Sequence, residues 1–217
     1  MPERLRQQLL DTTRGRIVTL LRGGGLTADD IASKLGLTRS AIRVQMTAME
    51  RDGVVGRVGK RAGTTRPSHV FELTSEVEQL LSKAYIPLLT HLVDVFADAL
   101  PASQVETLLR LTGQRLAGEL SRGRRVVGTV RARAAAASEI LNDHLGAMTH
   151  VEGNGGIVIR GGGCPLAALT GKHQGVCLAM ETVVAEIVGA PVRECCDRAG
   201  RPRCCFELQR GHGRRSP

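Results

Sequence analysis

The stretch TADDIASKLGLTRSAIRVQMTAMERDG, residues 27–53, decides the fold of the first part of the chain. Thr27 is a typical helix N-cap, and two acids follow it in the first turn, where the helix dipole favours negative charge. Gly36-Leu37 predicts a tight corner, and Thr38 is the next candidate N-cap. The helix from Arg39 to about Asp52 carries one apolar stripe, formed by Ile42, Met46 and Met49. The stretch therefore predicts two helices joined by a short turn.

The flanking segments extend this helix pair into a larger unit. Residues 4–22 place apolar side chains at helical spacing, and Gly23-Gly24-Gly25 ends that helix. Segment 54–58, with Val54, Val55 and Val58, predicts one strand, and segment 70–73, with Val70, Phe71 and Leu73, predicts its partner. A basic, glycine-containing loop from Gly59 to Ser68 lies between them. Three helices followed by a basic hairpin predict a winged helix-turn-helix domain over residues 1–75.

Charge favours a nucleic-acid partner for this domain. Residues 1–75 contain 13 Lys and Arg against 7 Asp and Glu, whereas residues 76–160 contain 9 of each. In a helix-turn-helix the second helix enters the major groove, where arginine pairs with guanine and glutamine with adenine. The predicted contacts are Arg39, Ser40 (to phosphate), Arg43 and Gln45 in the helix, and Lys60, Arg61 and Arg66 in the wing. The expected partner is double-stranded DNA. The alternatives are that Arg39 and Arg43 form only a solvated helix face, or that the winged helix is a protein-interaction module.

The middle region, residues 76–147, is predicted to be helical. A helix over Ser75–Leu100 has a wide apolar stripe, a capping serine as its first residue and a kink at Pro87. Two further helices are expected at about 103–120 and 130–144. We assign the Ser75–Leu100 helix to the seam of a homodimer. Two-fold symmetry would then place two recognition helices one DNA turn apart on a palindromic operator.

The last region, residues 148–210, contains all six cysteines of the chain. Alternating apolar residues around the turn 153–156 predict a hairpin. The elements expected after it are helices at about 165–172 and 176–188 and strands at about 191–196 and 203–208. Residues 211–217 are expected to form a disordered tail. The whole chain is thus predicted to be α+β and mainly helical, with a small α+β sensor domain at its end.

The cysteines suggest a metal site, because thiolates bind zinc and iron–sulfur clusters. Cys164 and Cys177 each stand at the expected start of a helix, where the dipole stabilises negative charge. Cys196 and Cys204 flank a turn centred on Gly200, so the two pairs could form a four-point cradle. Only one cysteine of each doublet points inward on a strand, since neighbours face opposite sides. Packing of small buried thiols is the alternative.

Several stretches resemble the SufR-type iron–sulfur-binding repressors. In the last region they are Cys164-Pro165-Leu166, His173-Gln174-Gly175-Val176-Cys177, Gly189-Ala190-Pro191-Val192 and Gly200-Arg201-Pro202-Arg203-Cys204-Cys205-Phe206-Glu207-Leu208. In the first region they are Leu37-Thr38-Arg39-Ser40-Ala41-Ile42-Arg43 and Arg66-Pro67-Ser68-His69-Val70-Phe71-Glu72-Leu73-Thr74. The resemblance covers nearly the whole chain. It implies a homodimeric repressor of iron–sulfur assembly genes that holds a cluster, with [4Fe–4S] favoured over [2Fe–2S].

The same resemblance implies which residues hold the cluster. The implied ligands are Cys164, Cys177 and Cys204, with Cys196 as the fourth. Cys195 is the rival of Cys196, and Cys205 competes with Cys204. His173 lies four residues before Cys177 and could reach a metal, although such a histidine more often lines a helix end.

Other functions remain as alternatives. The cysteine spacings lack the Cys-x-x-Cys pairs of common zinc modules, so zinc is the second cofactor considered, and a zinc or thiol–disulfide regulator is the second function. A small iron–sulfur redox enzyme is the third. Segment 153–163 lacks the context of a phosphate-binding loop, and we expect neither catalysis nor a small-molecule substrate. The start Met1-Pro2-Glu3-Arg4 lacks an apolar signal segment and no apolar run could span a bilayer, so we expect a cytoplasmic protein without a membrane partner.

Overall fold

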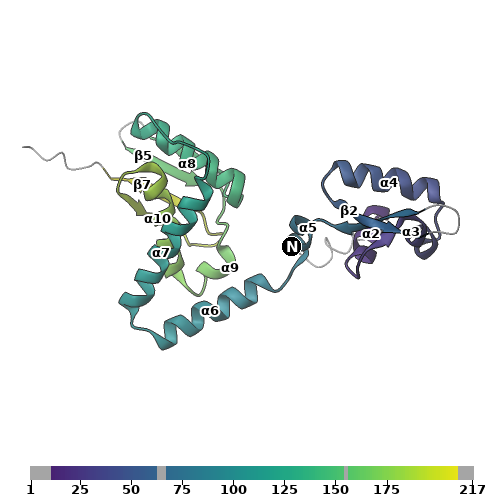
Figure 1. Cartoon of the computed structure of the whole chain (residues 1–217). Coiled ribbons are helices and arrows are strands. Elements are labelled where there is room, and N and C mark those ends of the chain that lie inside the picture. Colours follow the sequence, from purple (N-terminus) through teal and green to yellow (C-terminus); the bar gives the residue numbers. More distant parts are fainter. Residues whose placement is uncertain (1–10, 63–66, 154–155, 210–217) are drawn as a thin grey trace, which may run out of the picture. The chain divides into compact units, whose positions relative to one another are not determined.

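The computed structural model describes residues 11–62, 67–153 and 156–209. The chain divides into two compact units, Met1–Lys83 and Ala84–Pro217 (Figure 1). The division predicted from sequence has its boundaries at 75, 147 and 210, and the predicted tail 211–217 lies outside the described residues. In the structure, the residues up to Lys83 belong with the winged helix, and the helices beyond them share one unit with the cysteine-rich region.

The first unit is a winged helix. Its helices are α2 (Thr13–Leu21), α3 (Ala28–Leu35), α4 (Arg39–Arg51) and α5 (Ser75–Leu81), and its strands are β1 (Leu26–Thr27), β2 (Val55–Arg61) and β3 (Ser68–Leu73). The strands form an antiparallel sheet in the order β1-β3-β2. Ile17, Ile31, Ile42 and Met49 are fully buried in its core. The predicted fold of this part is confirmed. The helix residues 4–10 and the wing residues 63–66 lie outside the described residues.

Local signals set the helix ends in this unit. Thr27 and Asp30 form a reciprocal capping box at the start of α3, with backbone-to-side-chain distances of 2.9 and 3.1 Å. Gly36 ends α3 with φ +66°, a conformation that glycine adopts without a Cβ penalty. Thr38 then caps α4 by accepting a hydrogen bond from the Ala41 N–H. The turn between the two helices is therefore built from the residues that predicted it.

The single helix predicted over Ser75–Leu100 is wrong. The structure has two helices here, α5 and α6 (Tyr85–Ala99), separated at residues 82–84. Pro87 lies in the first turn of α6, where it needs no hydrogen-bond partner for nitrogen, but its ring would clash with the carbonyl of Lys83 in a continuous helix. The cap also differs, because the Ser75 hydroxyl bonds to the Glu76 carboxylate and α5 has no side-chain cap.

The second unit packs helices against a four-stranded antiparallel sheet. Its helices are α6, α7 (Ala102–Leu120), α8 (Val130–Leu145), α9 (Ala167–Thr170), the 3-10 turn η1 (Gln174–Val176) and α10 (Cys177–Val188). Its strands are β4 (Thr149–Glu152), β5 (Ile157–Gly161), β6 (Val192–Glu194) and β7 (Cys205–Leu208), in the order β4-β5-β7-β6. Ile159 and Phe206 face each other across β5 and β7 and are buried in one core with Leu141 of α8 and Val183 of α10.

Two features of this unit position the cysteines. Gly113 of α7 lets that helix lie very close to α10, since a Cβ at Gly113 would be 2.4 Å from the carbonyl oxygen of Ala179. The β6–β7 hairpin continues past its strands, because Cys195 N–H bonds to Cys205 O at 2.8 Å and Asp197 pairs with Arg203. The turn at residues 197–203 therefore returns the chain beside the start of α10.

In the described part of the chain, no single helix combines the length and apolar character needed to cross a membrane; only the broken pair α5 and α6, taken together, passes on length and composition.

Candidate nucleic-acid interface and metal centre

The exposed face of α4 presents a row of side chains that can read DNA. Ile42, Met46 and Met49 are buried, so the opposite face points to solvent. Arg43 is exposed on that face and pairs with no acid among the described residues. Gln45, also predicted to contact a base, is half-buried at the side of the helix.

Two further residues on this face were not singled out from the sequence. Val44 is 68% exposed, and Thr47 is exposed one turn further along. They share a face with Ser40, at helical spacings of four and seven residues. That periodicity was available in the sequence, and an exposed valine within a recognition helix is suited to the thymine methyl group.

Several predicted DNA contacts also bond within the protein. Arg39 Nε lies 3.2 Å from Asp29 Oδ1, and the hydroxyls of Ser40 and Thr38 are 3.2 Å apart. Arg61 pairs with Asp30 at 3.0 Å and donates to the Gly25 carbonyl at 3.3 Å. Arg61 thus ties β2 to the start of α3.

The pKa of Asp30 reflects these contacts. It is lowered chiefly by the hydrogen bond from the Thr27 backbone, with Arg61 as a smaller cause. In the wing, Lys60 is exposed and has no acidic partner within the ranges the structure covers, whereas Arg66 lies outside them.

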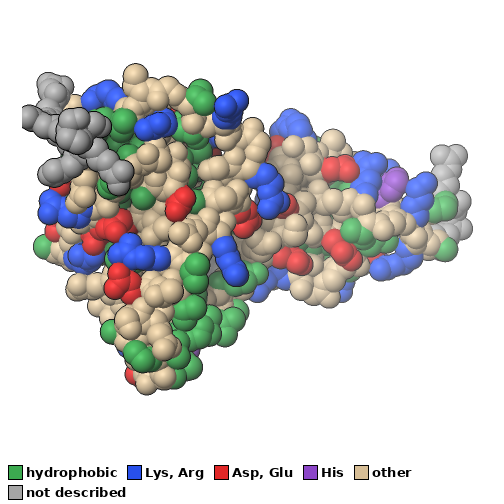
Figure 2. Space-filling view, turned by 60° about the vertical axis from the view of Figure 1, so that its left-hand side comes forward, with side chains coloured by type: hydrophobic (Ala, Val, Ile, Leu, Met, Phe, Trp, Pro, Cys, Tyr) green, Lys and Arg blue, Asp and Glu red, His purple; other side chains and the backbone are tan. Residues whose placement is uncertain are grey.

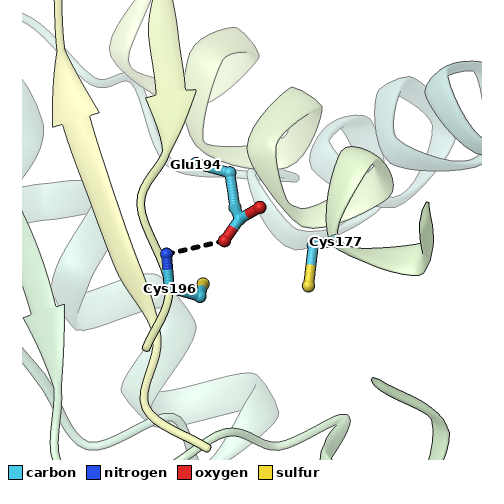
Figure 3. Close-up of side chains that lie close together, drawn as sticks. All are labelled: Cys177, Glu194 and Cys196. Atoms are coloured by element: carbon cyan, nitrogen blue, oxygen red, sulfur yellow. Dashed lines mark hydrogen bonds between the residues drawn. The ribbon is translucent and has the colours of Figure 1, made fainter. Parts of the chain in front are cut away.

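Three potential metal ligands meet at the start of α10. The Sγ atoms of Cys177 and Cys196 and a carboxylate oxygen of Glu194 all lie within 4.8 Å of one another (Figure 3). Cys177 is the first residue of α10, Glu194 ends β6, and Cys196 follows two residues later. The Cys196 N–H donates to Glu194 Oε1 at 2.6 Å, which folds the carboxylate toward the sulfur atoms (Figure 3).

Cys204 and Cys164 adjoin this group. The Cys204 side chain is 4% exposed and its thiol contacts that of Cys196. The Cys204 N–H donates to the Gly163 carbonyl at 3.2 Å, so Cys164 directly follows a residue bonded to Cys204. All four cysteines are free thiols in the structure. The start of α10 and the β6–β7 hairpin therefore bring the thiols of Cys177, Cys196 and Cys204 together, and Gly163, just before Cys164, is bonded to the same hairpin.

The other member of each doublet is engaged elsewhere. Cys195 lies directly after β6, opposite Cys205 at the start of β7, and the two form a disulfide bond. A sulfur in a disulfide offers no thiolate, so in this arrangement neither Cys195 nor Cys205 can ligate a metal. Cys196 and Cys204 remain available, as the alternation of strand side chains requires.

The pKa values of two thiols of the group, Cys177 and Cys196, are raised. The pKa of Cys177 is raised, first by its contact with Cys196 and then by burial. The contact with Cys177 lowers the pKa of Cys196, but its contact with Cys204 and burial together raise the pKa to about 12. Clustered thiols resist ionisation because neighbouring thiolates repel one another, and a bound metal removes that repulsion by displacing the protons.

Arg198 brings a positive charge to the same place. Its Nη2 lies 2.6 Å from Glu194 Oε2, and contact with Cys177 is the main cause that raises the pKa of Arg198. Its Nε is buried without a hydrogen-bond partner in the described structure. An orphaned donor on a side chain that contacts Cys177 fits an anionic group such as an iron–sulfur cluster, whose sulfur atoms accept hydrogen bonds.

His173 contacts a carboxylate. Its Nε2 lies 2.6 Å from Asp94 Oδ1 of α6, and Lys172 Nζ lies 2.7 Å from the same oxygen. The side chain of His173 is only 14% exposed. In this arrangement the Nε2 atom of His173 is engaged by Asp94, and ligation of a metal by His173 stays a prediction. The contact ties the loop that precedes Cys177 to α6.

Comparison with known proteins adds one finding for the first unit. Residues 10–55 match the family described as winged helix-turn-helix DNA-binding. A search of curated proteins finds no match. Among solved structures, the chain is similar to the adhesin competence repressor of Streptococcus pyogenes, at 19% identity and a TM-score of 0.28 over 50% of this chain and 79% of that one.

Two further solved structures are similar at the same level. For a mutant of ZitR from Lactococcus lactis in its apo form, the identity is 16% and the TM-score 0.28, over 52% of this chain and 85% of that one. For Bacillus subtilis PadR in complex with operator DNA, the identity is 18% and the TM-score 0.27, over 79% and 96%. The family match and the fold of the first unit together identify a winged helix-turn-helix DNA-binding domain in the first part of this chain.

Proposed function

We propose that the chain is a homodimeric transcriptional repressor whose affinity for its operator is controlled by an iron–sulfur cluster. The observation that carries the proposal is the convergence of the free cysteines Cys177, Cys196 and Cys204, with Cys164 beside them, in a chain that has a winged helix. The resemblance to SufR-type repressors supports a [4Fe–4S] cluster, with [2Fe–2S] second, and iron–sulfur assembly genes as targets.

The protein's own groups fit the binding of such a cluster. Cys177 begins a helix of 12 residues, whose dipole favours negative charge at that end. Cys196 and Cys204 are held by the hairpin, and Arg198 supplies a positive charge. When bound, a cluster supplies a centre that is lost under oxidation or iron shortage. Loss of the cluster would remove the group that joins the segments carrying the cysteines.

The contact network gives this change a route to α6. The segment between Cys164 and Cys177 is tied to α6 through Asp94, which accepts from both Lys172 and His173. Rearrangement of that segment on cluster loss would strain or release these contacts. We therefore assign α6 to the element that senses the state of the cysteine site.

The apolar face of α6 supports its role as a dimer seam. None of its residues is buried, although its sequence is strongly apolar. The exposed apolar residues of this helix are Tyr85, Ile86, Leu88, Leu89, Leu92, Val95 and Phe96. Figure 2 shows hydrophobic side chains gathered over the lower corner of the second unit, where α6 meets α7. A large exposed apolar patch of this kind is typical of a protein–protein interface, and a second copy of the chain is the occupant we propose.

In the dimer, the recognition helices would read a palindromic operator. Arg43 is the residue best placed for a bidentate guanine contact, since it is exposed and unpaired among the described residues. Such a contact discriminates against a wrong base by about 1–3 kcal/mol. Lys60 would contact phosphate, which anchors the wing without specifying sequence.

A thiol–disulfide or zinc regulator is the second candidate. It is favoured by the Cys195–Cys205 disulfide, which lies directly beside two of the free cysteines. In that case, oxidation of thiols or exchange of a zinc ion would replace cluster loss as the signal. Analysis of iron, sulfide and zinc in protein purified without oxygen distinguishes the two candidates.

The test is purification without oxygen, followed by visible absorption and by analysis of iron, acid-labile sulfide and zinc. We expect a brown protein that contains iron and sulfide. Each of the single variants Cys164→Ser, Cys177→Ser, Cys196→Ser and Cys204→Ser should lose the brown colour. The control, which replaces both Cys195 and Cys205 with serine, should keep it. A colourless protein that holds zinc and no sulfide would refute the cluster.

A further inference from the structure

We propose that, when no cluster is bound, Cys177, Cys196 and Glu194 form a site for a single divalent zinc ion. This goes beyond the proposed function, which uses cysteines alone and a cluster. The zinc site gives the cluster-free protein a second defined state.

The distances between the donor atoms favour a zinc site. The three donor atoms lie within 4.8 Å of one another, and Figure 3 shows the two sulfur atoms and the carboxylate around one space. Zinc binds sulfur at about 2.3 Å and carboxylate oxygen at about 2.0–2.2 Å, so donors in a tetrahedral site are about 3.6–3.8 Å apart. Shifts of about 1 Å in side chains would close the site around one ion.

The position of Glu194 in the chain also favours a zinc site. It lies two residues before Cys196 on an extended segment, and side chains at that spacing point to the same side of a strand. Its side chain is 17% exposed, and its Oε1 accepts the Cys196 N–H at 2.6 Å. The carboxylate is therefore fixed beside the sulfur atoms before any ion arrives, as a preorganised ligand should be.

The balance of charge around the three donors also favours a zinc site. Two thiolates and one carboxylate around a zinc ion leave a net charge of −1. Arg198, which pairs with Glu194 at 2.6 Å and contacts Cys177, balances that charge. A half-buried metal site is stable only when its charge is matched in this way. The fourth position is open to water or to Cys204, whose thiol contacts that of Cys196.

The sequence points to the two thiols of this site but not to its carboxylate. Glu194 is 17 positions from Cys177 and lies between an arginine and a cysteine, so it forms no recognisable spacing motif. Only the pairing of β6 with β7 and the position of α10 bring it to the two thiols.

The experiment titrates full-length, metal-free, reduced protein with Zn²⁺ in competition with a chromophoric chelator, without oxygen. We expect one zinc ion per chain. Glu194→Gln keeps the size of the side chain and an oxygen that can accept the Cys196 N–H, but it removes the negative charge. It should weaken zinc binding about tenfold or more, and Cys177→Ser should abolish it.

Matched controls make the result decisive. Glu207→Gln changes a carboxylate of the same sheet that pairs with Arg193 at 2.7 Å, and it should leave zinc affinity unchanged. Cobalt(II) provides a second readout, since its sulfur-to-metal absorption should persist in Glu194→Gln at saturation and vanish in Cys177→Ser. Circular dichroism checks that each variant is folded, and Glu194→Asp, which retains the charge, should bind more tightly than Glu194→Gln.

Two results would overturn the inference. One is a folded Glu194→Gln variant with the zinc affinity of the parent protein. The other is a parent protein that binds no stoichiometric zinc. Its failure is separable from that of the proposed function, because a protein that takes up a cluster but no zinc contradicts only this site. A protein that binds zinc but takes up no cluster contradicts only the proposed function.

Discussion

Gly113→Ala is expected to destabilise the second unit, although alanine is favoured over glycine inside a helix. An added Cβ at this position would lie 2.4 Å from the Ala179 carbonyl oxygen and 2.7 Å from Thr182 Cβ, both on α10. A helical carbonyl such as that of Ala179, in the first turn of α10, is held by the backbone and cannot rotate away, so α7 and α10 must separate. Gly118, on the same helix, offers a matched control, since a Cβ there would meet nothing within 4 Å.

The magnitudes follow from these contacts. Helix propensity favours alanine by about 1 kcal/mol at either position. Overpacking a tight contact costs about 1–3 kcal/mol, and an approach of 2.4 Å to backbone places Gly113 at the upper end. Gly113→Ala should therefore lose about 2 kcal/mol of unfolding free energy, whereas Gly118→Ala should gain about 1 kcal/mol.

Urea unfolding followed by circular dichroism measures both variants in the same buffer. The expected gap between them is about 3 kcal/mol, which equals the overpacking cost alone. Ala179 is two residues after Cys177, so Gly113→Ala should also lower metal retention. Equal stabilisation by both substitutions would mean that α7 and α10 do not pack through Gly113, and the position assigned to Cys177 would then lose its support.

Three more predictions test other parts of the account. Arg43→Ala should weaken binding to the preferred DNA duplex by about 1–3 kcal/mol in fluorescence anisotropy, while Arg122→Ala, in the second unit, should not. Leu92→Glu should convert the dimer to a monomer in light scattering, because it places a charge in the apolar face of α6; an unchanged mass would exclude that seam. The hydrogen bond from Lys172 is the main cause that lowers the pKa of Asp94. The charged Asp94 therefore contributes fully to stability at pH values above its pKa in the unfolded chain, and this contribution is lost as pH falls through its lower pKa in the folded protein. Acid unfolding below about pH 4 should therefore become less steep in Asp94→Asn, and a parallel acid transition in the two proteins would count against the contact.

The winged helix could be predicted from sequence because its signals are local. Thr27, Gly36 and Thr38 fix helix ends through neighbours three or four residues away, and the structure uses each of them as expected. Pro87 is also a local signal, and it indicates the break between α5 and α6. The apolar stripe continues on both sides of this break, which is why the sequence predicted a single helix.

The cysteine site depended on contacts that the sequence does not encode locally. Helix starts and a hairpin indicated that Cys177, Cys196 and Cys204 could meet. The pairing of Cys195 with Cys205 needs the register of two strands, since a shift of one residue would exchange the members of each doublet. Glu194 and Arg198 enter the site only through that register, and no spacing rule points to them.

In the function proposed above, the state of the cysteine site controls the affinity of the winged helix for DNA. The most direct measurement is the affinity of the protein, purified without oxygen, for a duplex selected from random sequence, before and after iron is removed with a chelator. We predict that affinity falls about tenfold or more on iron removal and returns when the cluster is rebuilt, with no such response in Cys177→Ser. An affinity that is the same in the loaded and stripped protein would contradict the claim.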